Sequence, residues 1–213
     1  MMEPKIFDIY VDSCCFIALA KCNINNLNDI SEVDFKALIT LLNSRGKHTI
    51  KDKDNKERTT HIVNIFTSML TIAECTHANE STHQEKEETR RLFKSILESG
   101  KVVKLISPTL GIIANARDLR WEHEINIHGA MDSIHVASAI NHKCSELITL
   151  DKKMLSSSGD DNEKIYNMFG LKIVAPSEIG LLNITSHDIF PEPLDMYSPG
   201  HKGDKLGIIR DDK

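Results

Sequence analysis

Residues 129–139, GAMDSIHVASA, have the spacing of a helix that begins after a short loop and carries a single acid. Asp132 is surrounded in this stretch by apolar side chains such as Met131, Ile134 and Val136. A carboxylate in such surroundings is costly unless something compensates its charge. The alternative is a surface aspartate in the first turn of a helix, where the helix dipole favours a negative charge. Three acids from distant parts of the chain favour a functional role.

The composition is that of an ordinary globular protein. The chain has 213 residues, of which 40% are hydrophobic and 27% charged, which fits one domain with additions. The sequence has no apolar run of about 18 residues and no signal peptide, so we expect a cytoplasmic protein that does not bind membranes. The net charge of −5 argues against a surface that binds nucleic acid everywhere, but it allows local basic patches.

The cysteines and histidines do not predict a zinc site. There are five cysteines and no C-x-x-C pair, so neither a disulfide framework nor a zinc clip is indicated. We interpret the cysteines as reduced and mostly buried. An HExxH motif is also absent, because His128 stands one position too far from the His123-Glu124 pair.

Two acids stand at the ends of predicted strands. Residues 5–11, KIFDIYV, are rich in β-branched and aromatic residues, and Asp12 follows them where a helix is expected to begin. Residues 145–150, SELITL, predict a second strand that ends at Asp151. In parallel sheets, functional groups gather outside the carboxyl ends of the strands. A helix N-cap is an equally good interpretation of Asp12, and the two roles can coexist.

A fourth acid lies within a predicted helix. Residues 61–66, HIVNIF, predict another strand, which runs into the helical stretch TSMLTIAECTHA. Glu74 shares its helical face with Leu70, Thr71 and Ala78, which is an unusual setting for an acid. A surface glutamate is the alternative interpretation.

The order of predicted elements indicates an α/β fold with a mainly parallel central sheet and helices on both faces. We place one domain over residues 1–180 and a C-terminal extension over residues 181–213, where prolines and glycines break the periodicity. Residues 43–60 interrupt the domain with six basic residues against three acids. A solvated insertion is the favoured interpretation of this segment. The alternative is a basic arm that binds phosphates through Lys51, Lys53 and Lys56.

If the two predicted strands are neighbours, the four acids come together at one edge of the sheet. Four carboxylates that close cannot all stay ionised without cations. Mg²⁺ and Mn²⁺ are the divalent ions that prefer oxygen ligands of this kind.

Four blocks of the sequence resemble the PIN-domain nucleases and occur in that family's order over roughly residues 5–176. They are IYVDSCCFIAL around Asp12, SMLTIAEC around Glu74, MDSIHVASA around Asp132 and LITLDKKM around Asp151. The resemblance implies a three-layer α/β/α Rossmann-like domain and metal-dependent cleavage of RNA. It also implies that the first three acids are the core metal ligands and that Asp151 is a fourth, more variable one.

The resemblance further assigns supporting positions to Ser13, Thr149 and His135, although a purely structural role also fits His135. Many small bacterial members of the family are toxins paired with an antitoxin protein. This chain differs from minimal members in its 43–60 segment, in its C-terminal extension and in Cys14 and Cys15.

We therefore predict a Mg²⁺- or Mn²⁺-dependent endoribonuclease that cleaves single-stranded or looped RNA. Its expected partners are RNA, an antitoxin protein and a second copy of the chain. The predicted contacts to the RNA backbone, besides those of the 43–60 segment, come from Arg117, Arg120, Lys152 and Lys153. Two other classes stay open: a catalytically silent PIN-fold module that binds RNA or protein, and a metal-dependent phosphatase that acts on small molecules.

Overall fold

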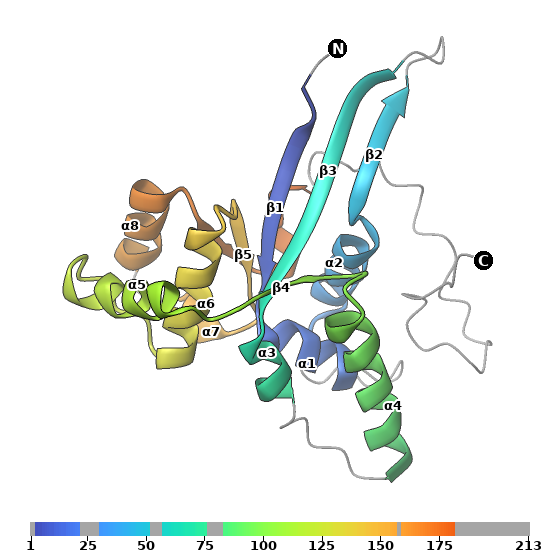
Figure 1. Cartoon of the computed structure of the whole chain (residues 1–213), viewed down its shortest axis with the longest axis horizontal. Coiled ribbons are helices and arrows are strands. Elements are labelled where there is room, and N and C mark those ends of the chain that lie inside the picture. Colours follow the sequence, from blue (N-terminus) through green and yellow to red (C-terminus); the bar gives the residue numbers. More distant parts are fainter. Residues whose placement is uncertain (1–2, 22–29, 52–56, 76–82, 157–158, 182–213) are drawn as a thin grey trace.

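The structure is a computed structural model that describes residues 3–21, 30–51, 57–75, 83–156 and 159–181. Six strands of this part of the chain form one sheet in the order β2-β3-β1-β5-β6, with β4 beside β3 (Figure 1). The strands are β1 (Lys5–Val11), β2 (Gly46–Lys51), β3 (Glu57–Ser68), β4 (Lys104–Ile106), β5 (Glu146–Ile148) and β6 (Lys172–Val174).

Strand β1 lies in the interior of the sheet and pairs in parallel with β3 on one side and with β5 on the other. Strands β4 and β6 also pair in parallel with their neighbours, and within the described ranges only the β2–β3 pair is antiparallel. The predicted mainly parallel sheet is therefore confirmed.

Helices cover both faces of this sheet, as the order of elements predicts. They are α1 (Ser13–Lys21), α2 (Glu32–Asn43), α3 (Leu70–Glu74), α4 (His83–Phe93), the π-helical turn η2 (Lys94–Glu98), α5 (Leu110–Trp121), α6 (Ala130–Asn141), α7 (Lys152–Leu155), α8 (Gly159–Phe169) and the 3-10 turn η3 (Pro176–Glu178).

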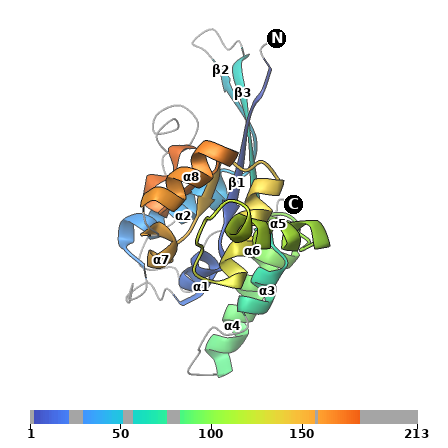
Figure 2. The ribbon, with the colours of Figure 1, turned by 90° about the vertical axis from the view of Figure 1, so that its left-hand side faces the viewer.

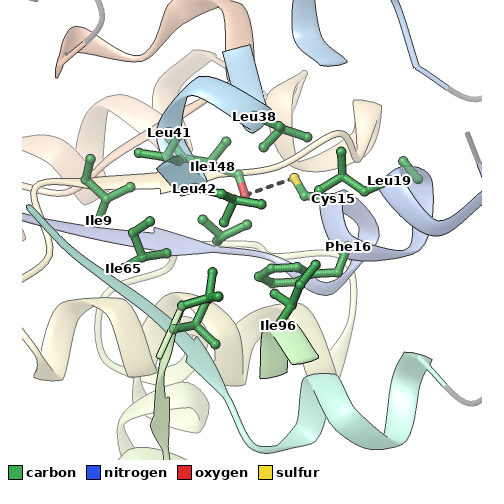
Figure 3. Packing of buried hydrophobic residues seen from close by; sticks show 14 of the residues in the cluster. Ile9, Cys15, Phe16, Leu19, Leu38, Leu41, Leu42, Ile65, Ile96 and Ile148 are labelled. Carbon is green, nitrogen blue, oxygen red and sulfur yellow. Dashed lines mark hydrogen bonds between the residues drawn. The ribbon is translucent and has the colours of Figure 1, made fainter. Parts of the chain in front are cut away.

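The core is divided into two layers by the alternation of side chains along the strands. Ile9 and Val11 of β1 point to one face, where they pack with residues of α1, α2 and η2 (Figure 3). Tyr10, between them, points to the other face and packs with residues of α5, α6 and α8. The result is the predicted three-layer α/β/α arrangement.

Residues 43–60 contain strand structure that was not predicted from the sequence. The β-branched residues in this segment allow β2 and the first part of β3 to form an antiparallel hairpin, with an irregularity in register between Ile50 and Lys51. The hairpin and the start of β1 extend beyond the helices (Figure 2). The positions of Lys53 and Lys56, and the C-terminal extension after Leu181, lie outside the described residues.

No helix in the described ranges is long and apolar enough to span a membrane.

Candidate active site

The carboxyl ends of β1 and β5 bring two of the predicted acids to the same edge of the sheet. Asp12 follows β1 directly, and its backbone N–H donates to the carbonyl of Ile148, the last residue of β5, at 2.9 Å. Asp151 follows β5 and caps helix α7, where its Oδ1 accepts from the N–H of Lys153 at 2.8 Å. The two strands are therefore neighbours, which is the condition under which the sequence brought these acids together.

The carboxylate of Asp12 is almost fully buried and held by neutral donors. Its Oδ1 accepts from the backbone N–H of Ser13 at 2.7 Å, and its Oδ2 accepts from the hydroxyl of Thr149 at 2.8 Å. The Cys14 thiol donates to the same Oδ2 at 3.1 Å. Donors of this kind fix the position of the carboxylate at the end of β1.

Glu74 is held by a chain of hydrogen bonds that begins inside the core. Oε2 of Glu74 lies 2.8 Å from Nε2 of His135, and Nδ1 of the same imidazole lies 2.6 Å from the hydroxyl of Tyr10. A neutral His135 therefore carries its proton on Nε2, donates it to Glu74 and accepts from Tyr10. The same Nε2 lies 3.7 Å from Oδ1 of Asp12, so the imidazole stands between two of the acids.

These contacts shift the pKa values of both partners toward the charged forms. Burial alone raises the pKa of Glu74, but the hydrogen bond and charge of His135, with a hydrogen bond from Ser13, lower it below its ordinary value. Burial alone lowers the pKa of His135, but Glu74, Asp12 and Asp132 raise it above its ordinary value.

Asp132 is the acid whose charge is least compensated. Its pKa is raised first by burial and then by the charges of Asp12 and Asp151; His135 opposes this, and Glu74 adds the smallest raising effect. The four predicted acids therefore come together closely enough to influence one another. Asp132 also lies against the backbone of Gly129, where an added Cβ would be only 2.8 Å from Oδ2, so no larger residue fits there without a shift.

The donor set suits a hard divalent cation in its chemistry, because it offers carboxylate oxygens and a local excess of negative charge. In the described ranges, however, no group of three or more His, Cys, Asp or Glu side chains is arranged to hold a metal ion as the side chains stand. Much of the Asp12 carboxylate is engaged by its donors, and Glu74 is turned toward His135. Side-chain rotation would be needed to bring the oxygens onto one ion.

The predicted RNA-binding cations are in different surroundings. Lys152 and Lys153 are exposed at the start of α7, directly after Asp151. On α5, Arg120 is exposed, whereas the guanidinium of Arg117 pairs with Asp118 at 2.7 Å and lies over the ring of Trp121.

The hairpin lysine, Lys51, lies far from the acids. It pairs with Glu57 at the start of β3, whereas Glu74 follows the end of that strand. Since β3 has 12 residues, its two ends are roughly 36 Å apart at about 3.3 Å per residue. The hairpin and the acid cluster are thus at opposite ends of the sheet.

Two residues of the site were not predicted from the sequence. Tyr10 is fully buried in β1. The signal in the sequence was a tyrosine within a predicted strand, because a buried tyrosine hydroxyl needs a hydrogen-bond partner. Cys14 contacts Asp12, the hydroxyl of Thr149 and the N–H of Leu150, so it is part of the hydrogen-bond network around the first acid.

Comparisons with known proteins agree with this fold. A family model for the PIN domain matches residues 32–157, which is more than half of the chain. No curated protein matches the chain. Asp12 precedes the matched region, so its place beside the other acids comes from the structure alone.

The fold is similar to that of three solved structures. A structure of FitAB bound to an IR36 DNA fragment has 14% identity and a TM-score of 0.50, covering 80% of this chain and 96% of the other. VapBC2 from Rickettsia felis, bound to a DNA fragment from their promoter, has 13% identity, a TM-score of 0.48 and coverages of 79% and 98%. FitAcB from Neisseria gonorrhoeae has 14% identity, a TM-score of 0.47 and coverages of 80% and 99%.

At 14% identity the FitAB structure bears on the fold alone, and the family assignment depends on the match over residues 32–157. Members of the PIN domain family are generally nucleases. Because the match spans more than half of the sequence and the sheet has the expected parallel order, this chain belongs to the PIN domain family.

Proposed function

We propose that this chain is a metal-dependent endoribonuclease that hydrolyses phosphodiester bonds of RNA. The observation that supports it most is the gathering of Asp12, Glu74 and Asp151 around Asp132, whose pKa is raised first by burial and then by the charges of these carboxylates. A cluster of acids from separate elements is costly to fold, and a bound cation would offset that cost.

Asp12, Glu74 and Asp132 would hold Mg²⁺ or Mn²⁺, with Asp151 contributing directly or through water. When bound, such an ion lowers the pKa of water for attack on phosphorus and stabilises the leaving oxygen. Ser13 and Thr149 orient the Asp12 carboxylate, and His135 orients that of Glu74.

The substrate would be held by its backbone rather than by its bases. Lys152 and Lys153 are exposed beside Asp151, where their charges attract phosphates toward an otherwise acidic site. A single-stranded or looped RNA suits this site better than a duplex, because an unstacked strand can reach a narrow acidic edge. We further propose that the protein is the toxin of a toxin–antitoxin pair that acts in the cytoplasm, with an antitoxin protein and a second copy of the chain as partners.

A catalytically silent module that binds RNA or protein is the second candidate. It is favoured by one observation, namely that no three acids of the described residues are arranged around a common metal position. Retention of all four acids at one edge of the sheet favours the nuclease.

The two candidates differ in one assay. With Mn²⁺ or Mg²⁺, the wild-type protein should cleave a labelled single-stranded RNA into shorter products. Cleavage should stop when EDTA removes the metal. A small phosphate monoester should stay intact. Asp12→Asn should bind the same RNA without cleaving it. RNA binding without cleavage by the wild type, in either metal, would support the silent module, and hydrolysis of the monoester alone would support a phosphatase.

A further inference from the structure

Besides the acid cluster, a second group of charged residues lies along the edge of β3 that faces away from β1. Strand β2 pairs with β3 as far as Val63, and β4 pairs with it from Phe66 onward. Both lie on the same edge, because His61, Val63 and Phe66 also pair with β1 on the opposite edge. Between them, Asn64 and Ile65 have no strand partner on that edge in the described part of the chain.

This gap is hollowed into a pocket of about 160 Å³. Alternate residues of a strand direct their N–H and carbonyl to opposite edges, so one of Asn64 and Ile65 directs its backbone groups into the gap. Gly46 and Gly100 stand at its rim with φ values of +100° and +68°, and an added Cβ at either would meet nothing within 4 Å. The pocket is therefore open to a ligand of modest size.

The charged residues that line the pocket are all cations. Arg45, Lys101 and Lys104 belong to the lining, which includes no acid. None of the three forms an ion pair with a described carboxylate. Like charges without counter-ions raise the local potential, which an anion would lower.

The structure holds two of these cations in fixed positions. The Arg45 guanidinium donates from Nε to the carbonyl of Lys101 at 2.9 Å and from Nη1 to that of Leu42 at 3.1 Å, which leaves further N–H groups for a ligand. Nζ of Lys104 donates to the side-chain oxygen of Asn64 at 2.8 Å and lies over the ring of Phe66. The amide of Asn64 donates in turn to Asp8, so it separates that carboxylate from the lysine.

We propose that this pocket binds a backbone phosphate of a single RNA strand. A phosphate matches it in three ways, because guanidinium, ammonium and backbone N–H groups are all donors to phosphate oxygens. From Ile65 to the end of β3 at Ser68 is about 10 Å, and α3 with Glu74 follows at once. A strand a few nucleotides long can therefore contact both places. The choice of RNA as the source of the phosphate depends on the proposed nuclease function.

The test is RNA binding without cleavage. A short fluorescent single-stranded RNA is titrated in EDTA over a range of salt concentrations, with wild type, the Lys101→Gln/Lys104→Gln variant and a Lys143→Gln/Lys164→Gln control. The control also removes two charges, but from exposed side chains in the turn after α6 and on α8, neither of which lines the pocket. Pyrophosphate is titrated separately against each protein as the free-phosphate probe.

The pocket variant should bind RNA about tenfold more weakly than wild type, and its log–log salt slope should fall by about 1.4, or 0.7 for each lost contact. The control should bind like wild type. Equal losses in both variants would show only an effect of net charge and would overturn the proposal. Weaker pyrophosphate binding with unchanged RNA binding would overturn RNA as the occupant.

Two further measurements keep the test decisive. If the double variant has a lower melting temperature than wild type, the single Lys101→Glu variant is used, because its changed side chain is exposed. It should also lose RNA affinity while the control does not. Because binding is measured in EDTA, a protein that never cleaves RNA can still show the selective loss. That result would support the proposed phosphate pocket and contradict the proposed nuclease function.

Discussion

The acid cluster and the cationic pocket both lie where strands of one sheet end, yet they are built in opposite ways. The acids come from four separate elements, and Asp12 and Glu74 are fixed by hydrogen bonds of 2.7–2.8 Å. The two lysines of the pocket are exposed, and Lys104 is held through Asn64. Chemistry on a phosphodiester needs a cation gathered by the carboxylates, whereas attraction of a charged strand needs only positive charge in the right region. Substitutions in the two places should therefore affect different steps.

The largest effect is expected from Asp132→Asn. Cleavage should fall at least about a hundredfold, because the variant loses a proposed metal ligand, while RNA affinity in EDTA should not fall. The melting temperature of the metal-free protein should stay the same or rise, since one charge leaves a repulsive cluster. Asp160→Asn, at an exposed aspartate of α8, is the control. Near-wild-type cleavage by Asp132→Asn over a range of Mg²⁺ and Mn²⁺ would remove the acid cluster from the active site.

Metal should stabilise the fold through the acids and not through the pocket. An ion at about 100 times its dissociation constant adds roughly 2.7 kcal/mol to the free energy of unfolding. Calorimetry should show this Mn²⁺ effect in wild type and in the Lys101→Gln/Lys104→Gln variant. It should be much smaller in Asp12→Ala/Asp132→Ala. Equal stabilisation of all three proteins would place the metal elsewhere.

Tyr10→Phe should weaken metal binding without touching a ligand. The variant loses the hydroxyl that holds Nδ1 of His135, so the imidazole holds Glu74 less firmly. A loss of about tenfold in Mn²⁺ affinity is expected, beyond a loss of stability of about 1–3 kcal/mol from the unpaired buried nitrogen. Tyr166→Phe, at an exposed tyrosine, is the matched control. Reduced stability with unchanged Mn²⁺ affinity would limit Tyr10 to packing.

The smallest effect is expected from the hairpin lysines. Neutralising Lys51, Lys53 and Lys56 should flatten the salt dependence of RNA binding by about 0.7 for each contact that exists, and turnover at saturating RNA should not change. The roughly 36 Å length of β3 puts this end far from the acids, so a long RNA should respond more than a short one. Identical binding of both RNAs by variant and wild type would show that the hairpin has no part in holding RNA.

The sequence was sufficient for the α/β fold, but the meeting of the acids depended on which strands are neighbours. Predicted strands ended at Asp12 and Asp151, and the pairing of β1 with β5 in the structure places both at one edge. The hairpin was missed because lysines and acids in residues 43–60 obscured β-branched residues such as Thr49 and Ile50, which pair with Thr60 and Thr59.

Long-range contacts were beyond the sequence for a physical reason. Tyr10 and His135 are 125 positions apart, and neither residue's local pattern indicates the other. The pocket depends on a gap between the start of β2 and the start of β4, which is a property of register and not of residue type. The periodicity of a sequence indicates the faces and the ends of strands. It does not indicate which residues of a strand lack a partner on a neighbouring strand.

The position of β1 between β3 and β5 also has a consequence for protein synthesis. Asp12 leaves the ribosome before Thr149, whose hydroxyl holds its carboxylate and which is 137 positions later. At about 5–20 residues per second, translation takes roughly 7–27 s to cover that interval. A nascent chain therefore carries the first acid through that interval without the strand that completes the cluster, and a chain released before β5 never assembles it.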